Sequence, residues 1–149
     1  MSIRFTVERS IQVDKQTAYK SLLDLDSAQD WMQGLVGIER LDKGPLQIGS
    51  QWKETRKMYG KEATEHFEVM EIEEPNKIIF LCDGTKGTTG KGEFVFTYVI
   101  EASGDHSDTL YGEIKGLTGI AKFFGKMMAE AFKKACAKDL DALKSYLEK

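Results

Sequence analysis

Apolar and polar residues near the carboxyl end of the chain are spaced as in one long amphipathic helix. Between residues 118 and 148, apolar side chains recur three and four positions apart, which places them on one helical face. Such a helix would be about 45 Å long, and its apolar face needs a partner surface of matching length. We therefore expect a broad sheet to pack against this helix, with Thr118 as its N-cap.

The amino-terminal residues alternate between apolar and polar side chains. Residues 3 to 13 follow this pattern, which is the period of a strand with one solvated face. Asp14 is then expected to cap a short helix that extends to Leu23. A second short helix is expected to carry Trp31 and to stop at Gly34. The sequence thus predicts two short helices after the first strand.

Turn-forming residues divide the middle of the chain into six further strand-like runs. Short turns between consecutive runs are typical of an antiparallel meander. The predicted order is one strand, two short helices, six strands and one long helix. This order favours an α+β fold in which a curved, seven-stranded antiparallel sheet wraps around the last helix. The turns are expected at Gly44-Pro45, Gly49-Ser50, Gly60, Pro75-Asn76, the glycine cluster from Gly84 to Gly92, and Gly104-Asp105.

This order of elements resembles the helix-grip fold of the START-related SRPBCC superfamily, which includes the polyketide cyclase/dehydrase and lipid-transport group. The resemblance covers essentially the whole chain. It implies a cavity for an apolar ligand between the sheet and the last helix. The residues that carry it are Val13-Asp14 at the end of the first strand, Trp31, Gly49-Ser50-Gln51-Trp52, the turn Glu71-Ile72-Glu73-Glu74-Pro75, and the last helix.

Length and composition narrow the class of protein. A chain of 149 residues with 41% apolar and 30% charged residues is typical of one globular domain, spanning residues 1–149. The net charge of −3 provides no basic field, which argues against a nucleic-acid partner. No apolar run approaches the roughly 18 residues of a membrane span, and the amino terminus lacks an apolar leader pattern. We expect a soluble, unexported protein with no integral membrane segment.

Cysteine and lysine positions add to this picture. Cys82 and Cys136 lie far apart inside apolar segments, so we interpret them as buried thiols and not as a disulfide. This favours the reducing cytoplasm. Lysines of the last helix form a strip that Asp139, Asp141 and Glu148 interrupt. Such a strip is more typical of a solvated helix face than of a membrane-binding surface.

The hairpin that begins at Gln51 is predicted to carry charges on its inner face. A turn at Gly60-Lys61 would set Arg56 opposite Glu65, whereas a turn at Tyr59-Gly60 would set Glu54 opposite Glu65, which is a like-charge pair. Both turns leave the same residues on the inner face, unless a bulge intervenes near Val69-Met70, where the alternation falters. The inner face comprises Trp52, Glu54, Arg56, Met58, Ala63, Glu65, Phe67 and Val69.

Glu54, Arg56 and Glu65 are the informative residues of this face, because buried charges are costly unless they are paired. A paired polar cluster in an apolar wall would orient a polar group of a ligand. A structural ion pair, or a position near a wet end of the sheet, is the alternative. For the aromatic and methionine residues, core packing is the alternative to ligand contact. The predicted ligand-binding residues are Trp31, Trp52, Glu54, Arg56, Met58, Glu65, Phe67, Phe94, Phe96, Tyr98, Phe123 and Met127.

Several segments resemble catalytic or ligand-binding motifs but do not match them in spacing or context. The glycine-rich segment from Gly84 to Gly92 lacks the spacing of a phosphate loop and precedes a strand instead of a helix. We interpret it as a flexible connection. His66 is expected on the outer face, opposite Thr55, and His106 in a polar turn, so neither is well placed as a base. No cluster has zinc-ligand spacing and no hydrolase motif is present, so we expect neither a metal nor a cofactor.

Three functions remain open. The first is a carrier or binding protein for an apolar, lipid-like or polyketide-like molecule. The second is a cyclase or dehydratase in which Glu54 or Glu65 acts as acid or base, and Arg56 or Tyr98 holds a developing enolate. The third is a protein-interaction module whose cavity is closed by side chains. We expect a monomer or a weak homodimer, and the sequence identifies no protein partner.

Overall fold

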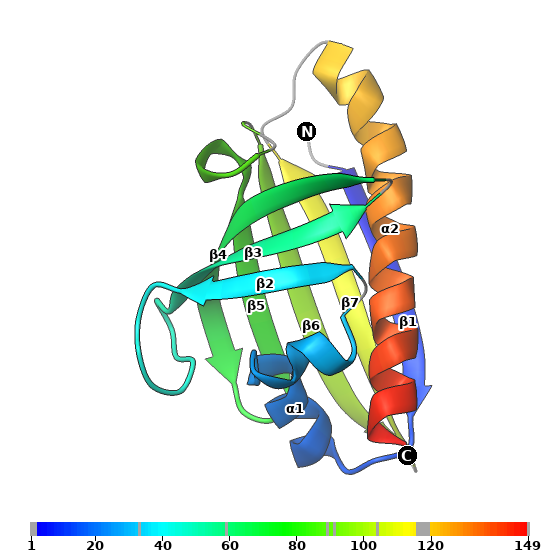
Figure 1. Ribbon diagram of the computed structural model, residues 1–149. Helices are drawn as coiled ribbons and strands as arrows, with labels where there is room; N and C mark the ends of the chain where they lie inside the picture. Colours follow the sequence, from blue (N-terminus) through cyan, green and yellow to red (C-terminus); the bar gives the residue numbers. More distant parts are fainter. Residues whose placement is uncertain are drawn as a thin grey trace.

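One sheet and one long helix dominate the protein (Figure 1). The computed structural model describes residues 3–148 except 33, 59, 89, 91, 104 and 116–119, and it describes the side chains of these residues except 3, 58, 102–129 and 132. The elements are β1 (Ile3–Ile11), α1 (Lys15–Leu23), the 3₁₀ turn η1 (Ser27–Asp30), β2 (Leu35–Arg40), β3 (Gln51–Met58), β4 (Lys61–Glu73), β5 (Lys77–Asp83), the 3₁₀ turn η2 (Gly84–Lys86), β6 (Glu93–Ser103), β7 (Asp105–Lys115) and α2 (Ile120–Leu147).

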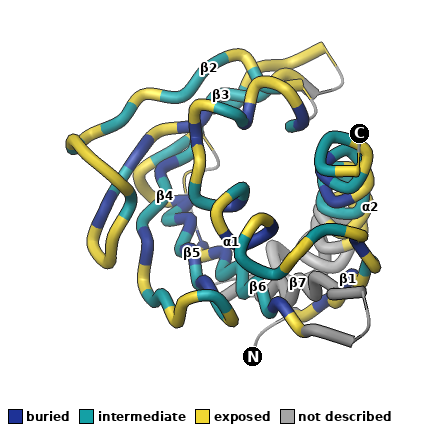
Figure 2. Tube along the Cα trace, turned by 90° about the horizontal axis from the view of Figure 1, so that it is seen from below, coloured by how far each residue is buried: buried dark blue, intermediate teal, exposed yellow. Residues whose placement is uncertain are grey.

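The strands form a single antiparallel sheet in the order β1-β7-β6-β5-β4-β3-β2. Seen from below, the sheet forms an arc from β2 to β1, and α2 lies across its open side (Figure 2). With 28 residues, α2 is about 42 Å long, so it can face the sheet along its length. The predicted α+β helix-grip fold, with a curved antiparallel sheet and a carboxyl-terminal helix, is therefore confirmed. The expected N-cap, Thr118, lies outside the described residues.

The segment after β1 matches the prediction in its first helix and differs in its second. Asp14 caps α1, because its Oδ1 accepts a hydrogen bond of 2.7 Å from the backbone N–H of Thr17. The second element is one 3₁₀ turn, and Trp31 follows it as the C-cap residue. A four-residue stretch is too short to hold an α-helix by itself, and 3₁₀ hydrogen bonds suit such short connections. Gly34 follows with φ +70°, a conformation that glycine adopts without strain.

The β3–β4 hairpin has the register of the Tyr59-Gly60 turn. Met58 pairs with Lys61, Glu54 lies directly opposite Glu65, and Arg56 lies opposite Ala63. The like-charge pair that counted against this register is therefore present. The other register, in which Arg56 would pair with Glu65, is absent, and the assignment of residues to the inner face is the same in either register.

A bulge is present in β4 at the place where the alternation falters. The pairing of β4 with β5 shifts between Val69 and Glu71, which leaves Met70 as the extra residue. A bulge bends its strand and increases the local twist. The side chain of Val69, just before the bulge, is fully buried, whereas that of Met70, the extra residue, is exposed.

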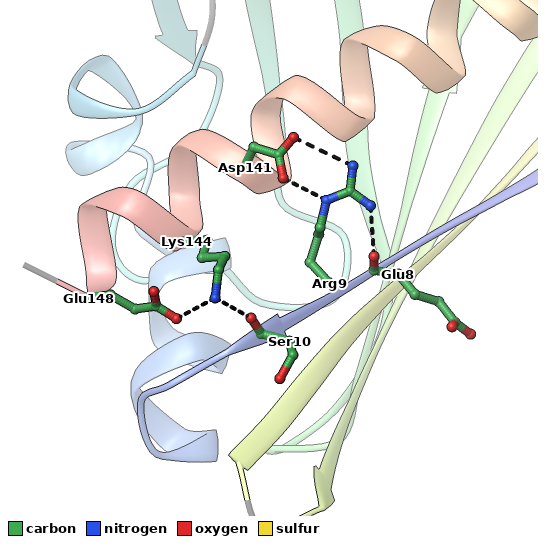
Figure 3. A network of polar contacts seen from close by, with 6 residues as sticks. All are labelled: Glu8, Arg9, Ser10, Asp141, Lys144 and Glu148. Carbon is green, nitrogen blue, oxygen red and sulfur yellow. Dashed lines mark hydrogen bonds and ion pairs between the residues drawn. The ribbon is translucent and has the colours of Figure 1, made fainter.

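The carboxyl-terminal half of α2 is fastened to β1 by polar contacts (Figure 3). Arg9 donates from Nε to Asp141 Oδ1 at 2.5 Å, and Lys144 donates to the carbonyl of Ser10 at 2.6 Å and to Glu148 at 2.7 Å. Leu140 and Leu143 of α2 belong to the buried core together with residues of β1, α1, β5 and β6. Other members of that core are Ile11, Ala18, Tyr19, Leu22, Ile78 and Ile100.

Candidate ligand cavity

A cavity of about 230 Å³ lies between the inner face of the sheet and α2. Four consecutive strands, β3 to β6, supply one wall, α2 supplies the facing wall, and the end of α1 with the segment that follows it supplies the remainder. Among the described residues, the lining consists of Leu22, Leu25, Met32, Trp52, Glu54, Arg56, Ala63, Glu65, Phe67, Phe80, Cys82, Phe94, Phe96, Tyr98, Ala135, Cys136 and Asp139.

Strand register explains why residues far apart in sequence meet in this wall. Trp52 of β3 pairs with Phe67 of β4, Phe67 pairs with Cys82 of β5, and Cys82 pairs with Phe94 of β6. Residues directly opposite in a sheet share a face. One row of side chains therefore crosses four strands, and the period of two within each strand brings Glu54, Glu65, Phe80, Phe96 and Tyr98 to the same surface.

The aromatic side chains of this wall touch one another in a continuous series. Trp52 stacks on Phe67 with ring centroids 5.5 Å apart and planes 8° apart, and it meets Phe80 edge to face at 5.2 Å. Phe80 in turn lies 5.8 Å from Tyr98, and Phe67 lies 6.4 Å from Phe96. These separations are in the range where aromatic pairs stabilise one another beyond simple burial. The wall is thus a continuous packed aromatic surface.

One charged cluster interrupts the apolar wall. Arg56 donates from Nε to Glu54 Oε2 at 2.9 Å and from Nη1 to Asp139 Oδ2 at 2.7 Å. The side chains of Arg56, Glu54 and Asp139 are 19%, 8% and 14% exposed. Glu65 lies opposite Glu54 on the neighbouring strand and lines the same cavity. We refer to Glu54, Glu65 and Asp139 together as the carboxyl cluster.

Burial raises the pKa of the Glu54 carboxyl group. Removal from water raises the pKa of Glu54 above its ordinary value of 4.5, and the neighbouring charge of Arg56 only partly opposes this shift. The pKa of Arg56 is raised further above its already high value by Glu54 and Asp139, although its own burial acts in the opposite direction. The guanidinium therefore stays charged, while Glu54 is a carboxyl group that can hold a proton.

The phenol and the two thiols of the lining stay protonated at neutral pH. Burial raises the pKa of the Tyr98 phenol well above 10, and burial raises the pKa of the Cys136 thiol to about 12. The pKa of Cys82 is raised for the same reason. Both cysteines are free, Cys82 is buried and Cys136 is half-buried, so their interpretation as thiols without a disulfide agrees with the structure.

The structure brings together most of the residues that the sequence selected for this site. Trp31 is buried in the core but does not line the cavity. The side chains of Met58, Phe123 and Met127 lie outside the described set. The residues that do line the cavity are Trp52, Glu54, Arg56, Glu65, Phe67, Phe94, Phe96 and Tyr98.

Asp139 is the charged residue of the cavity that the sequence reasoning missed. The sequence places it on a solvated helix face, yet it lines the cavity and pairs with Arg56. Its spacing held a signal, because it lies three residues after Cys136 and four before Leu143 on the apolar stripe. Phe80 and Cys82 carried less information. Their strand is apolar on both faces, with Ile79 and Leu81 between the inward residues.

The glycine-rich connection before β6 packs against the cavity wall. The backbone N–H of Thr88 donates to the carbonyl of Thr64 at 2.8 Å, and the N–H of Thr64 donates to the Thr88 hydroxyl at 2.9 Å. A Cβ added to Gly87 would lie 2.7 Å from the carbonyl oxygen of Thr64 and 2.9 Å from Cα of Glu65. Glycine at this position therefore permits a close backbone approach to β4.

His66 lies outside the cavity, as expected for the outer face, but its partner differs from the prediction. It pairs with Lys53 in the sheet and not with Thr55, because the hairpin register differs. Its side chain is only 6% exposed, and its Nε2 is 2.9 Å from Oε1 of Gln51. The side chain of His106 lies outside the described set.

The residues that the structure describes lack two features. None of these residues forms a group of three or more histidine, cysteine, aspartate or glutamate side chains arranged to hold a metal ion. Nor does any helix among them combine the length and the apolar character needed to cross a membrane.

The sequence matches the family described as polyketide cyclase/dehydrase and lipid transport over residues 2–148. The chain belongs to this family, and its membership of the SRPBCC superfamily is confirmed. No curated protein matches the sequence.

Solved structures share the fold at low sequence identity. The ginseng major latex-like protein 151 from Panax ginseng has a TM-score of 0.82 and 11% identity, with 98% of this chain and 97% of that chain covered. A protein from Thermus thermophilus has a TM-score of 0.77 and 15% identity, with 97% of each chain covered. The di-domain ARO/CYC protein StfQ from the steffimycin biosynthetic pathway has a TM-score of 0.79 and 9% identity, with 99% of this chain and 51% of that chain covered.

Proposed function

We propose that the protein binds an apolar or polyketide-like small molecule between the sheet and α2. The observation that carries this proposal is the cavity of about 230 Å³, which has aromatic walls and one charged cluster. A mostly apolar pocket with a few convergent polar groups is the usual form of a small-molecule site. An apolar cavity of roughly 150 Å³ holds one benzene ring, so we expect a ligand of about one or two fused rings.

The family and the structural neighbours support this proposal. The family description combines polyketide cyclases with lipid transport, and about half of the ARO/CYC protein StfQ has the same fold as this chain. Fold similarity alone does not transfer a substrate. The proposal therefore depends on the side chains of this cavity.

A cavity-filling variant tests the proposal. Ala63 lines the cavity, and a phenylalanine there would occupy part of its volume. Glu62 is its exposed neighbour on the opposite face of β4, so Glu62→Phe adds the same side chain to the same strand without entering the cavity. Isothermal titration of the neutral probe 1-naphthalenemethanol measures binding to each variant.

We expect Ala63→Phe to weaken binding of the probe at least about tenfold and Glu62→Phe to leave it unchanged. Near-ultraviolet circular dichroism establishes that both variants are folded. Native mass spectrometry of gently purified protein, before and after organic extraction, should also reveal a bound mass that extraction removes. Equal probe binding by folded Ala63→Phe and by the wild type would refute the proposed site.

A second candidate function is catalysis of a dehydration in the same cavity. It is favoured by Glu54, which is 7% exposed and whose pKa is raised by burial. A protonated Glu54 would give its proton to a leaving hydroxyl group, which departs as water. Glu65 would take the proton from the adjacent carbon, and a carbon–carbon double bond would form. Arg56 and Tyr98 would stabilise the enolate that develops on a neighbouring carbonyl.

The variant Glu54→Gln separates catalysis from binding. It keeps the shape of the side chain but cannot deliver a proton. If the protein is a dehydratase, incubation with a β-hydroxy aryl ketone that fits the cavity should give the dehydrated product with the wild type and none with Glu54→Gln, while binding of the substrate persists. Turnover at the same rate in both proteins would exclude Glu54 as the acid. The matched variant Glu65→Gln tests the base in the same assay.

The third function, an interaction module, assumed a cavity closed by side chains. The cavity of about 230 Å³ among the described residues removes that assumption.

A further inference from the structure

The charged side chains that line the cavity are unequal in number. Among the described residues they comprise the three carboxyl groups of the carboxyl cluster and a single guanidinium, that of Arg56. Even when Glu54 holds a proton, acidic side chains outnumber the one guanidinium, and in a low-dielectric wall this excess favours a positive group of a ligand over a negative one. The part of the cavity lined by Arg56 and the carboxyl cluster is therefore expected to distinguish ligands by their charge.

The protein itself already uses part of the hydrogen-bonding capacity of Arg56. Two of its nitrogens already bind Glu54 and Asp139 at 2.9 and 2.7 Å. An anionic ligand approaching Arg56 would have to lie beside these carboxyl groups. Placing like charges side by side in a poorly solvated site is strongly unfavourable. A fatty-acid carboxylate or a phosphate is therefore disfavoured at this end of the cavity.

The aromatic wall next to the carboxyl cluster suits a cation. Trp52 and Glu54 are two residues apart on the inner face of β3, and Trp52 stacks on Phe67, which is likewise two residues from Glu65 on β4. Aromatic faces attract ammonium groups, with tryptophan the strongest. Rings and carboxyl groups on the same two strands can therefore hold an ammonium group together.

We propose that the ligand is an aromatic amine whose ammonium group lies in the carboxyl cluster while its rings pack on the wall formed by Trp52, Phe67 and Phe80. This inference rests on the proposed function, because it names the class of molecule that the same cavity takes. It narrows the ligand from apolar molecules in general to organic cations, and it excludes anionic lipids.

Four naphthalenes that differ in one substituent test this inference by isothermal titration at neutral pH. The probes are 1-naphthylmethylamine, 1-naphthalenemethanol, 1-naphthoic acid and naphthalene. We expect the amine to bind at least about tenfold more tightly than the acid, with the alcohol between them. Equal or tighter binding of the acid would overturn the inference while leaving the proposed cavity function intact. Absence of binding by all four probes would overturn the proposed function and this inference with it.

Two variants locate the selectivity. Glu65→Gln removes one carboxylate without touching the hydrogen bonds of Arg56, and Asp139→Asn removes the carboxylate on α2. Each should reduce the preference for amine over acid several-fold. Asp141→Asn is the matched control, because this exposed residue lies on the same helix and pairs with Arg9 outside the cavity. Thermal unfolding establishes which variants are folded. An unchanged preference in folded Glu65→Gln would overturn the role of the carboxyl cluster.

Discussion

Arg56 in β3 donates a hydrogen bond of 2.7 Å to Asp139 in α2, and the two residues are separated by 83 positions in the sequence. The contact joins the sheet to the helix across the cavity wall. Arg56 also holds Glu54 on its own strand, so three charged side chains share one poorly solvated site. Removing one member of such a group leaves its partner buried without full compensation, and this usually costs more than the group contributes when intact.

Two aspartates of α2 allow that cost to be measured. Asp139 is 14% exposed and pairs with Arg56, whereas Asp141 is 57% exposed and pairs with Arg9. We expect Asp139→Ala to lower the free energy of unfolding by about 3 kcal/mol. Asp141→Ala should lower it by less than about 1 kcal/mol. Urea unfolding followed by tryptophan fluorescence measures both, and equal losses would contradict the assignment of a buried cluster.

Glu54 gives the stability of the protein a pH dependence of unusual sign. Its pKa is raised on folding, chiefly by burial, so the folded state binds more protons than the unfolded state at a pH between the two pKa values. Stability from this group is full below about 4.5, the ordinary pKa, and is lost as the pH rises toward the folded-state value. Most paired carboxylates behave in the opposite way.

The variant Glu54→Gln should remove this contribution. As the pH increases above about 4.5, the wild type should lose the stability that protonated Glu54 contributes, whereas Glu54→Gln should not. We therefore expect the free energy of unfolding of Glu54→Gln minus that of the wild type to increase with pH. Guanidinium unfolding at closely spaced pH values measures the difference. Glu65→Gln, treated identically, tests whether the effect belongs to Glu54. A difference that stays constant with pH, or that falls as the pH rises, would show that Glu54 does not retain its proton.

The hairpin of β3 and β4 shows how far the sequence alone can lead. The period of two placed the inner residues correctly, because either turn position preserves it. The register depended on a judgement about charge, and opposing Glu54 to Glu65 looked unfavourable. That judgement did not take into account the ion pair between Arg56 and Asp139, which joins the sheet to α2. Their contact depends on tertiary packing, which no local pattern contains.

A similar limit explains the other differences. Asp139 belongs to the apolar stripe by spacing but was interpreted by its charge, because burial of an aspartate makes sense only once its arginine is known. The 3₁₀ turn at Ser27–Asp30 could not be distinguished from a short α-helix, since the two share capping residues and differ only in hydrogen-bond spacing. The Asp14 cap and the element order depend on local chemistry, and these were predictable.

Gly87 should be sensitive to the addition of a single methyl group. A Cβ there would lie too close to the backbone of Thr64 and Glu65, and neither β4 nor the cavity wall can easily yield. We expect Gly87→Ala to cost about 1–3 kcal/mol, as overpacking does. Gly37→Ala is the control, because nothing lies within 4 Å of its added Cβ. Thermal unfolding of both variants measures the difference, and a fully stable Gly87→Ala would indicate that the connection can move away from β4.

The rates at which the two thiols react with a labelling reagent measure how far water and reagents reach into the cavity. Burial raises the pKa of Cys136 to about 12 and raises that of Cys82 as well. The reactive thiolate is therefore scarce at pH 8, and its greater intrinsic nucleophilicity only partly compensates. We expect Ellman's reagent to label the folded protein at least about tenfold more slowly than the urea-unfolded protein. Cys82→Ser and Cys136→Ser assign the rates to single residues. If folded Cys82→Ser reacts as fast as its unfolded form, water and reagent reach Cys136 freely, and the wall formed by α2 is open to solvent.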